Sequence, residues 1–151
     1  MLALTAAAFF ALPAKMLLQT PAVWPIGVLV CLLILSSVLY HTRHLPLVRA
    51  FDLLMVRATS IAMLGSSVCG LLQRGGSATR RVHCTGVLLG LVACCAINAL
   101  PSCREFLRDP RTGKLGLGGS NIKVQWHAAM HAVYAISLGT LAMGWAEEDW
   151  R

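Results

Sequence analysis

Residues 24–41 read Trp-Pro-Ile-Gly-Val-Leu-Val-Cys-Leu-Leu-Ile-Leu-Ser-Ser-Val-Leu-Tyr-His, and this stretch decides the fold class. It holds no acidic or basic side chain before His41. A helix that crosses the apolar part of a bilayer takes about 20 such residues. Ser37 and His41 lie four residues apart near the end of the stretch. The sequence therefore predicts a transmembrane helix with polar groups near one end.

Other apolar stretches lie at about residues 2–18, 50–72, 83–100 and 124–145. The first is short, so it either crosses the membrane or lies at its surface. Of the 151 residues, 57% are hydrophobic and 13% are charged, whereas a soluble domain has about 25% charged residues. We therefore predict one all-α domain over residues 1–151, a polytopic transmembrane helical bundle of four to five spans.

The net charge of +7 comes from 13 basic and 6 acidic residues. The basic residues are spread between the apolar stretches, which suits membrane topology and anionic headgroups rather than nucleic acid. We therefore expect membrane lipids as partners and no nucleic acid. Four of the six cysteines lie well inside predicted spans and none forms a Cys-x-x-Cys pair. This pattern favours neither a disulfide framework nor a cysteine zinc site.

Ionisable side chains inside apolar stretches mark functional sites, because a bilayer makes them costly. Asp52 opens the third stretch, and His127 and His131 lie four apart in the last. Residues four apart share one face of a helix. The second span ends and the third begins on one membrane side, and two further crossings return the chain to that side. Ser37, His41, Asp52, His127 and His131 should therefore converge near one surface.

Three imidazoles that leave one position open are typical of a catalytic zinc site. We predict His41, His127 and His131 as zinc ligands. Asp52 would take a proton from water or orient a histidine, and Ser37 would donate a hydrogen bond to a developing oxyanion.

Each of these residues also has a simpler interpretation. A single histidine at a membrane surface can be an ordinary end residue, and Asp52 can pair with Arg49 three residues back. Ser37 can bond a carbonyl of its own helix. His44, in the loop, could replace His41 as a ligand. The shared membrane side of the five residues favours a site over these separate explanations.

Basic residues are slightly more numerous on the predicted side of the cluster, which favours the positive, cytoplasmic or matrix- or stroma-like side. His83 begins the fourth stretch on the opposite side and should not join the cluster. Arg57 is the one charge inside a span, where it can reach the surface or a lipid phosphate. The cluster side carries Arg43, Arg49, Arg104, Arg108, Arg111, Lys114 and Lys123, and the other carries Lys15, Arg74, Arg80, Arg81 and Arg151.

The order of these residues resembles the CREST superfamily of membrane hydrolases, which includes alkaline ceramidases and the adiponectin/progestin receptors. The family pattern is Ser-x-x-x-His in an early span, an Asp opening the next span, and His-x-x-x-His in the last. It is matched by Ser37, His41, Asp52, His127 and His131. The short gap before Asp52 and the pair Trp126-His127 are similar to the ceramidase branch.

The resemblance implies Zn2+ held by His41, His127 and His131, with Asp52 activating water and Ser37 assisting the oxyanion. The implied substrate is a lipid amide, such as ceramide. Family members usually have seven spans, so this chain would be a truncated CREST-like bundle. No acidic residue precedes Asp52 to match the amino-terminal calcium site of the ceramidases.

Two functions follow from this comparison. The first is a zinc-binding CREST-like membrane hydrolase of lipid amide or ester bonds, which the resemblance places in the endomembrane system. The alternative is a reduced CREST-like accessory subunit of a larger membrane complex, respiratory or photosynthetic, without turnover, in a mitochondrial or plastid inner membrane. A third reading is a plain helical accessory subunit with no family link.

Overall fold

The computed structural model describes the backbone of residues 2–43, 45–99 and 121–146, and the side chains of residues 7–40, 42, 45–97, 99 and 127–146. This part of the chain forms helices only, which confirms the predicted all-α class. The helices are α1 (Leu2–Leu18), α2 (Trp24–Arg43), α3 (Pro46–Leu72), α4 (Ala78–Ala99) and α6 (Asn121–Ala146). Each lies on one of the apolar stretches found in the sequence.

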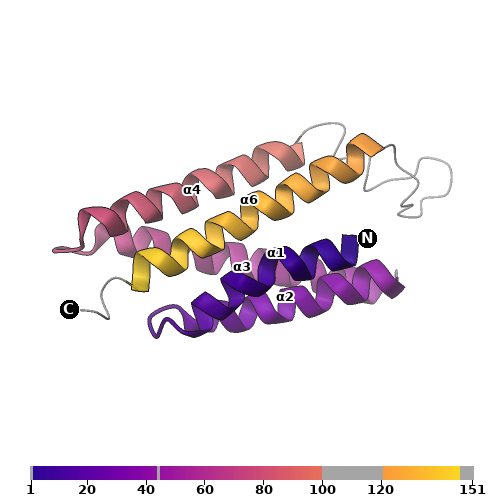
Figure 1. Cartoon of the computed structure of the whole chain (residues 1–151), viewed down its shortest axis with the longest axis horizontal. Helices are drawn as coiled ribbons and strands as arrows, with labels where there is room; N and C mark the ends of the chain where they lie inside the picture. The colour runs from indigo at the N-terminus through magenta and orange to yellow at the C-terminus, as the bar shows by residue number, and fades with distance from the viewer. Residues whose placement is uncertain (1, 44, 100–120, 147–151) are drawn as a thin grey trace.

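The helices form a closed ring in which α1, α2, α3, α4 and α6 each pack against the next, and α6 packs against α1. Consecutive helices run in opposite directions, whereas α6 and α1 run in the same direction (Figure 1). As a result, α1, α3 and α6 begin at one end of the bundle. We call it the histidine end, because it holds the part of α6 that carries His127 and His131. The opposite end is the arginine end, after Arg80.

Two of the connections that the structure describes are shorter than the gaps between the apolar stretches. The gap before the stretch at about residues 50–72 contains Pro46, but α3 begins at Pro46 itself. Proline suits this first helical position because its missing N–H has no partner there in any case. At the start of α4, the Ser77 hydroxyl accepts a hydrogen bond from the backbone N–H of Arg80 at 3.0 Å, as a helix cap does. Arg80 and Arg81, expected in a loop, therefore lie in the first turn of α4.

Every described helix contributes to a single apolar core. Leu17, Val30, Met63, Val87 and Leu138, one from each helix, are fully buried. Burying such side chains contributes about 1.5–3 kcal/mol each in apolar transfer free energy. The core therefore runs along the axis of the ring and holds all five described helices together.

Helices α4 and α6 approach closely because small residues line their contact. A Cβ atom placed on Gly90 would overlap the Ser137 hydroxyl, and one on Gly144 would lie 2.8 Å from the His83 Cβ. Small residues allow the backbones of membrane helices to pack closely. This contact fixes the position of α6, and with it the position of the two histidines.

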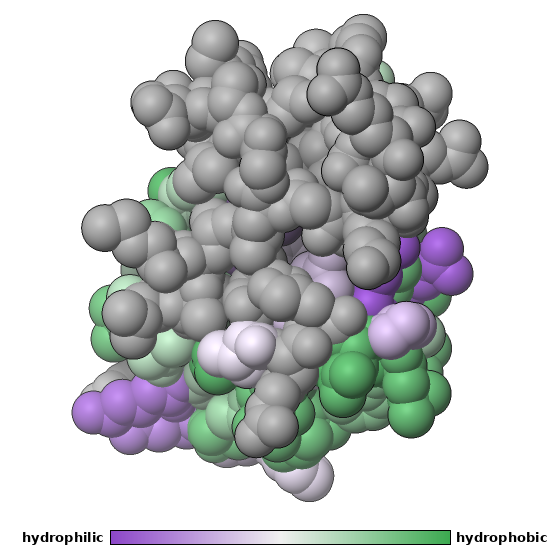
Figure 2. Space-filling model, turned by 90° about the vertical axis from the view of Figure 1, so that its right-hand side faces the viewer, coloured by the Kyte–Doolittle hydropathy of each residue, from purple (hydrophilic) through white to green (hydrophobic). Residues whose placement is uncertain are grey.

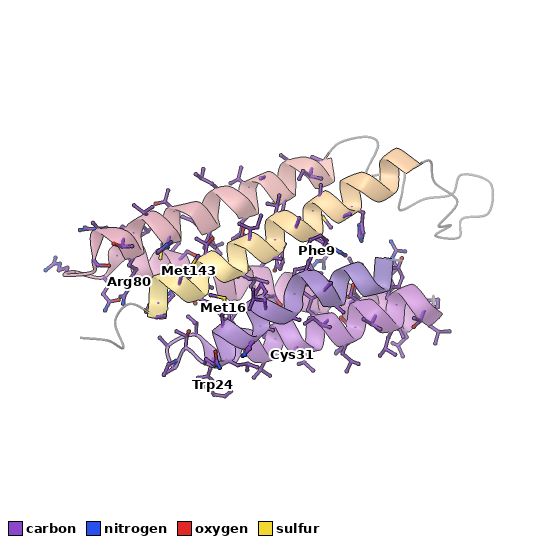
Figure 3. All side chains as sticks on the ribbon, viewed as in Figure 1. Phe9, Met16, Trp24, Cys31, Arg80 and Met143 are labelled. Atoms are coloured by element: carbon purple, nitrogen blue, oxygen red, sulfur yellow. The ribbon has the colours of Figure 1, made fainter. Side chains whose placement is uncertain are left out.

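Arg80 is fully buried at the arginine end (Figure 3). Its Nη1 donates to Oε1 of Gln73 at 2.6 Å, and its Nε donates to the Gly144 carbonyl at 3.4 Å. The guanidinium carbon lies 4.5 Å from the ring centroid of Trp145, within cation–π range. Arg80 therefore joins the ends of α3 and α6 to the start of α4.

One segment of the described residues, Ala78–Ile97, is long and apolar enough to cross a membrane, judged by length and composition. Ala7–Leu18 and Trp24–Tyr40 are apolar helices of shorter length.

We expect Gly90→Val to destabilise the protein by about 1–3 kcal/mol, because the added side chain must displace Ser137 and push α4 away from α6. The measurement is the unfolding midpoint in detergent. Gly139→Val is the matched control, since a Cβ on Gly139 meets nothing within 4 Å. Equal losses in both variants would contradict the close helix contact.

We expect Arg80→Met to cost about 2–3 kcal/mol of unfolding free energy, since it leaves the oxygens of Gln73 and Gly144 without a charged donor. Thermal unfolding of the purified protein would measure this loss. Arg81→Met, at the exposed neighbouring position, should change stability by less than about 0.5 kcal/mol. A harmless Arg80→Met would show that the buried guanidinium does not hold the three helices together.

Candidate functional site

The two histidines of α6 lie side by side at the histidine end. The ring centroids of His127 and His131 are 4.4 Å apart, with 60° between the ring planes. His131 is 8% exposed and His127 is partly buried. Phe10 of α1 meets His131 edge-on at a centroid distance of 5.5 Å. The spacing of four residues thus gives two neighbouring imidazoles, the geometry that a shared metal ion would require.

Asp52 is positioned by a serine of the neighbouring helix. The hydroxyl of Ser36 donates to Oδ1 of Asp52 at 2.8 Å and lies 3.0 Å from the carbonyl oxygen of Leu33. Ser36 is fully buried and Ser37 is also buried. The sequence predicted no serine partner for Asp52 and gave Ser37 a role at an oxyanion; the hydroxyl that reaches the carboxylate belongs to Ser36. A role for Ser37 at an oxyanion stays a prediction.

Tyr134 fixes the height of α6 relative to α3. Its hydroxyl lies 2.9 Å from the Ser60 hydroxyl and 3.4 Å from the Val56 carbonyl oxygen. Both helices start at the histidine end. At a rise of about 1.5 Å per residue, Asp52 lies about 12 Å from the level of Ser60, and His127 lies about 10 Å from the level of Tyr134. His127 is therefore at nearly the height of Asp52, whereas His131, three residues from Tyr134, is about 7 Å from that height.

The third predicted ligand, His41, lies in the last turn of α2, five residues beyond Ser36. Its side chain is outside the described residues, and so is His44. Among the described side chains, no group of three or more His, Cys, Asp or Glu could hold a metal ion. The described part of the predicted zinc site thus consists of the two imidazoles of His127 and His131, a donor set that suits zinc.

His83 lies at the arginine end, against Gly144 of α6. It is therefore far along the bundle from His127 and His131, as its place at the start of the fourth stretch predicted.

Three residues that matter for the arrangement were not singled out in the sequence. Ser36 was not chosen because the Ser-x-x-x-His spacing selects Ser37, and its bond to Asp52 depends on how α2 faces α3. Tyr134 continues the face of His127 and His131 with a spacing of three, and that pattern could have revealed it. The burial of Arg80 has no sequence signal, since it depends on where α3 and α6 end.

Comparisons of the chain with protein-family models, with curated proteins and with solved structures found no match. The likeness to the CREST pattern therefore depends on the spacing of its motif residues.

We expect Ser36→Ala to lower stability by about 1.5–3 kcal/mol, because Asp52 loses the donor to its partly buried carboxyl group. Ser37→Ala removes a buried hydroxyl from the adjacent position and should cost less. Chemical unfolding of both variants in one detergent measures the difference. If Ser37→Ala proved the more harmful, the pairing of Asp52 with Ser36 would be wrong.

Proposed function

We propose that the protein is a multi-pass membrane protein that binds zinc at its histidine end and hydrolyses an amide or ester bond of a membrane lipid. The observation that carries this proposal is the neighbouring pair of imidazoles of His127 and His131 inside one end of a helical bundle, with His127 near the height of Asp52.

The outer surface of the bundle supports a location in the membrane. Each described helix exposes large apolar side chains, and for Leu12, Leu35, Ile61, Val92 and Ile136 more than half of the residue surface is exposed. Exposed apolar patches of this extent are rare on soluble monomers. Figure 2 views the histidine end, where apolar side chains (green) fill much of the lower part and hydrophilic ones (purple) lie at the edges. A lipid environment would cover this surface.

The spacing of tryptophans agrees with the thickness of a bilayer. Trp126 and Trp145 lie 19 residues apart on α6, which is about 28 Å along a helix. The hydrocarbon core is about 30 Å thick, and tryptophan gathers at its two surfaces. Trp24, at the arginine end, is exposed and begins α2 (Figure 3). The length of α6 between its two tryptophans is enough for a full span with the histidines near one surface, although Trp145 itself packs over Arg80 inside the bundle.

The donor set favours zinc as the bound ion. His127 and His131 supply two neighbouring imidazoles, and His41 of α2 is the proposed third ligand. When bound by three neutral imidazoles, zinc polarises a carbonyl and acidifies a water at its open position.

The remaining polar groups would move a proton and orient the substrate. Asp52 accepts the Ser36 hydrogen bond at Oδ1, which fixes the carboxyl group and leaves Oδ2 to take a proton from water. Ser37 would donate to the oxygen that becomes negative during attack on the lipid carbonyl. The apolar surface around the histidine end suits a lipid chain rather than a soluble substrate.

A second candidate function is that of an accessory subunit without turnover. Phe10 of α1 contacts both His131 and Tyr134, at centroid distances of 5.5 Å and 6.0 Å. Helix α1 thus covers one side of the histidine pair. This is expected if the pair, or a metal ion bound to it, stabilises the bundle and does not act on a substrate. In this alternative the zinc, if bound, would tie α2 to α6.

We expect the purified protein to contain one zinc per chain, and His131→Ala to lower the zinc content by at least about tenfold. Asp52→Asn should retain zinc and abolish hydrolysis of a long-chain ceramide, because the amide cannot accept the proton. Metal analysis and product detection on the same samples measure both effects.

His83→Ala is the matched control, since it removes a histidine from the other end of the bundle. Zinc-free wild-type protein would contradict the proposal as a whole. Full hydrolytic activity in Asp52→Asn would refute the role of Asp52. Stoichiometric zinc with no hydrolysis of any lipid amide or ester would favour the accessory subunit.

A further inference from the structure

Helix α3 presents an apolar face away from the bundle, and this face carries one positive charge. Arg57 is exposed on it, together with Ile61 and Leu72, which are 70% and 76% exposed. The face consists of Arg57, Ile61, Leu64, Gly65, Val68 and Leu72, spaced three and four residues apart along the helix. We call these six residues the α3 outer face. The core-facing side of α3 is a different set, which includes Thr59 and Met63.

Among the described residues, no acidic side chain is placed to balance the positive charge of Arg57. Asp52 is the one acidic residue among the described side chains, and its carboxyl group bonds Ser36 between α2 and α3. Five residues along a helix correspond to about 140° of rotation, so Asp52 and Arg57 point in different directions. A guanidinium in an apolar environment requires a counter-charge, because its desolvation is costly.

The depth of Arg57 places the required counter-charge inside the proposed membrane. Arg49, one residue before the third apolar stretch, suits the headgroup region. Arg57 follows eight residues later, about 12 Å farther along α3. A carboxylate on a neighbouring transmembrane helix could meet it at that depth.

Gly65 favours a helix as the occupant of this face. It lies two turns beyond Arg57 on the same face, and a Cβ placed on it meets nothing within 4 Å. Because Gly65 has no side chain, it leaves open space on the outer surface of α3, where the backbone of another helix can approach closely. A lipid phosphate would neutralise the charge of Arg57, but it would not fill the open space at Gly65.

We propose that the α3 outer face binds a transmembrane helix of another subunit, with an Asp or Glu of that helix paired to Arg57 and its backbone crossing α3 at Gly65. The proposal shares the membrane location with the proposed function, but it does not depend on zinc or on hydrolysis.

The test uses the full chain in phosphatidylcholine bilayers with a synthetic leucine–alanine transmembrane helix. One version of the helix carries a single Glu about 12 Å below one membrane surface, and the other carries Gln there. Association is measured by energy transfer between labels. We expect the Glu helix to bind about tenfold more tightly than the Gln helix, as for a polar contact between membrane helices.

Two variants locate the contact. Arg57→Gln should remove the preference for Glu, and Gly65→Leu should weaken binding of both helices. Arg81→Gln, at the arginine end, is the matched control and should behave as wild type. The zinc content of Arg57→Gln should equal that of wild type, so loss of helix binding is separable from loss of the proposed zinc site.

Equal binding of the Glu and Gln helices to wild type would overturn the proposal, and so would an unchanged Glu preference in Arg57→Gln. A third result would also overturn it. If phosphatidylglycerol displaced the Glu helix from wild type but not from Arg57→Gln, the counter-charge of Arg57 would be a lipid phosphate.

Discussion

The contact of Tyr134 with α3 sets the height of the whole site. In the ring, helix α6 packs between α1 and α4. It also makes a small contact with α3 across the interior. The Tyr134 hydroxyl, between Ser60 and Val56, is part of that contact. A buried hydroxyl must keep its hydrogen bonds, so sliding α6 along its axis would leave it without them. This requirement keeps His127 near the height of Asp52.

The helices could be found in the sequence because each is built from a long run of apolar residues, some buried in the core and others exposed. All five described helices fall on the stretches chosen from composition, with ends that differ by a few residues. The differences have local causes: Pro46 begins α3 instead of interrupting a loop, and Ser77 caps α4 so that Arg80 enters the helix. Such end effects depend on single side chains, which hydropathy does not register.

Less of the candidate site than of the fold could be predicted from the sequence. The spacing of His127 and His131 was sufficient to place two imidazoles together, because helix geometry alone determines that relation. The partner of Asp52 depends on how far α2 is rotated about its own axis. That rotation results from packing among several helices, so the sequence could not show that Ser36 reaches Asp52.

The parallel arrangement of α1 and α6 has a consequence for biosynthesis. The ring closes only when α6, synthesised after the other described helices, enters between α1 and α4. Until then, Phe10 of α1 and Gly90 of α4 have no α6 to contact. An early ribosome-bound chain would therefore hold Asp52 with Ser36 but would lack the imidazoles of α6. The pairing of His127 with His131 beside Phe10 is thus a late event, which separates packing of the first helices from formation of the candidate site.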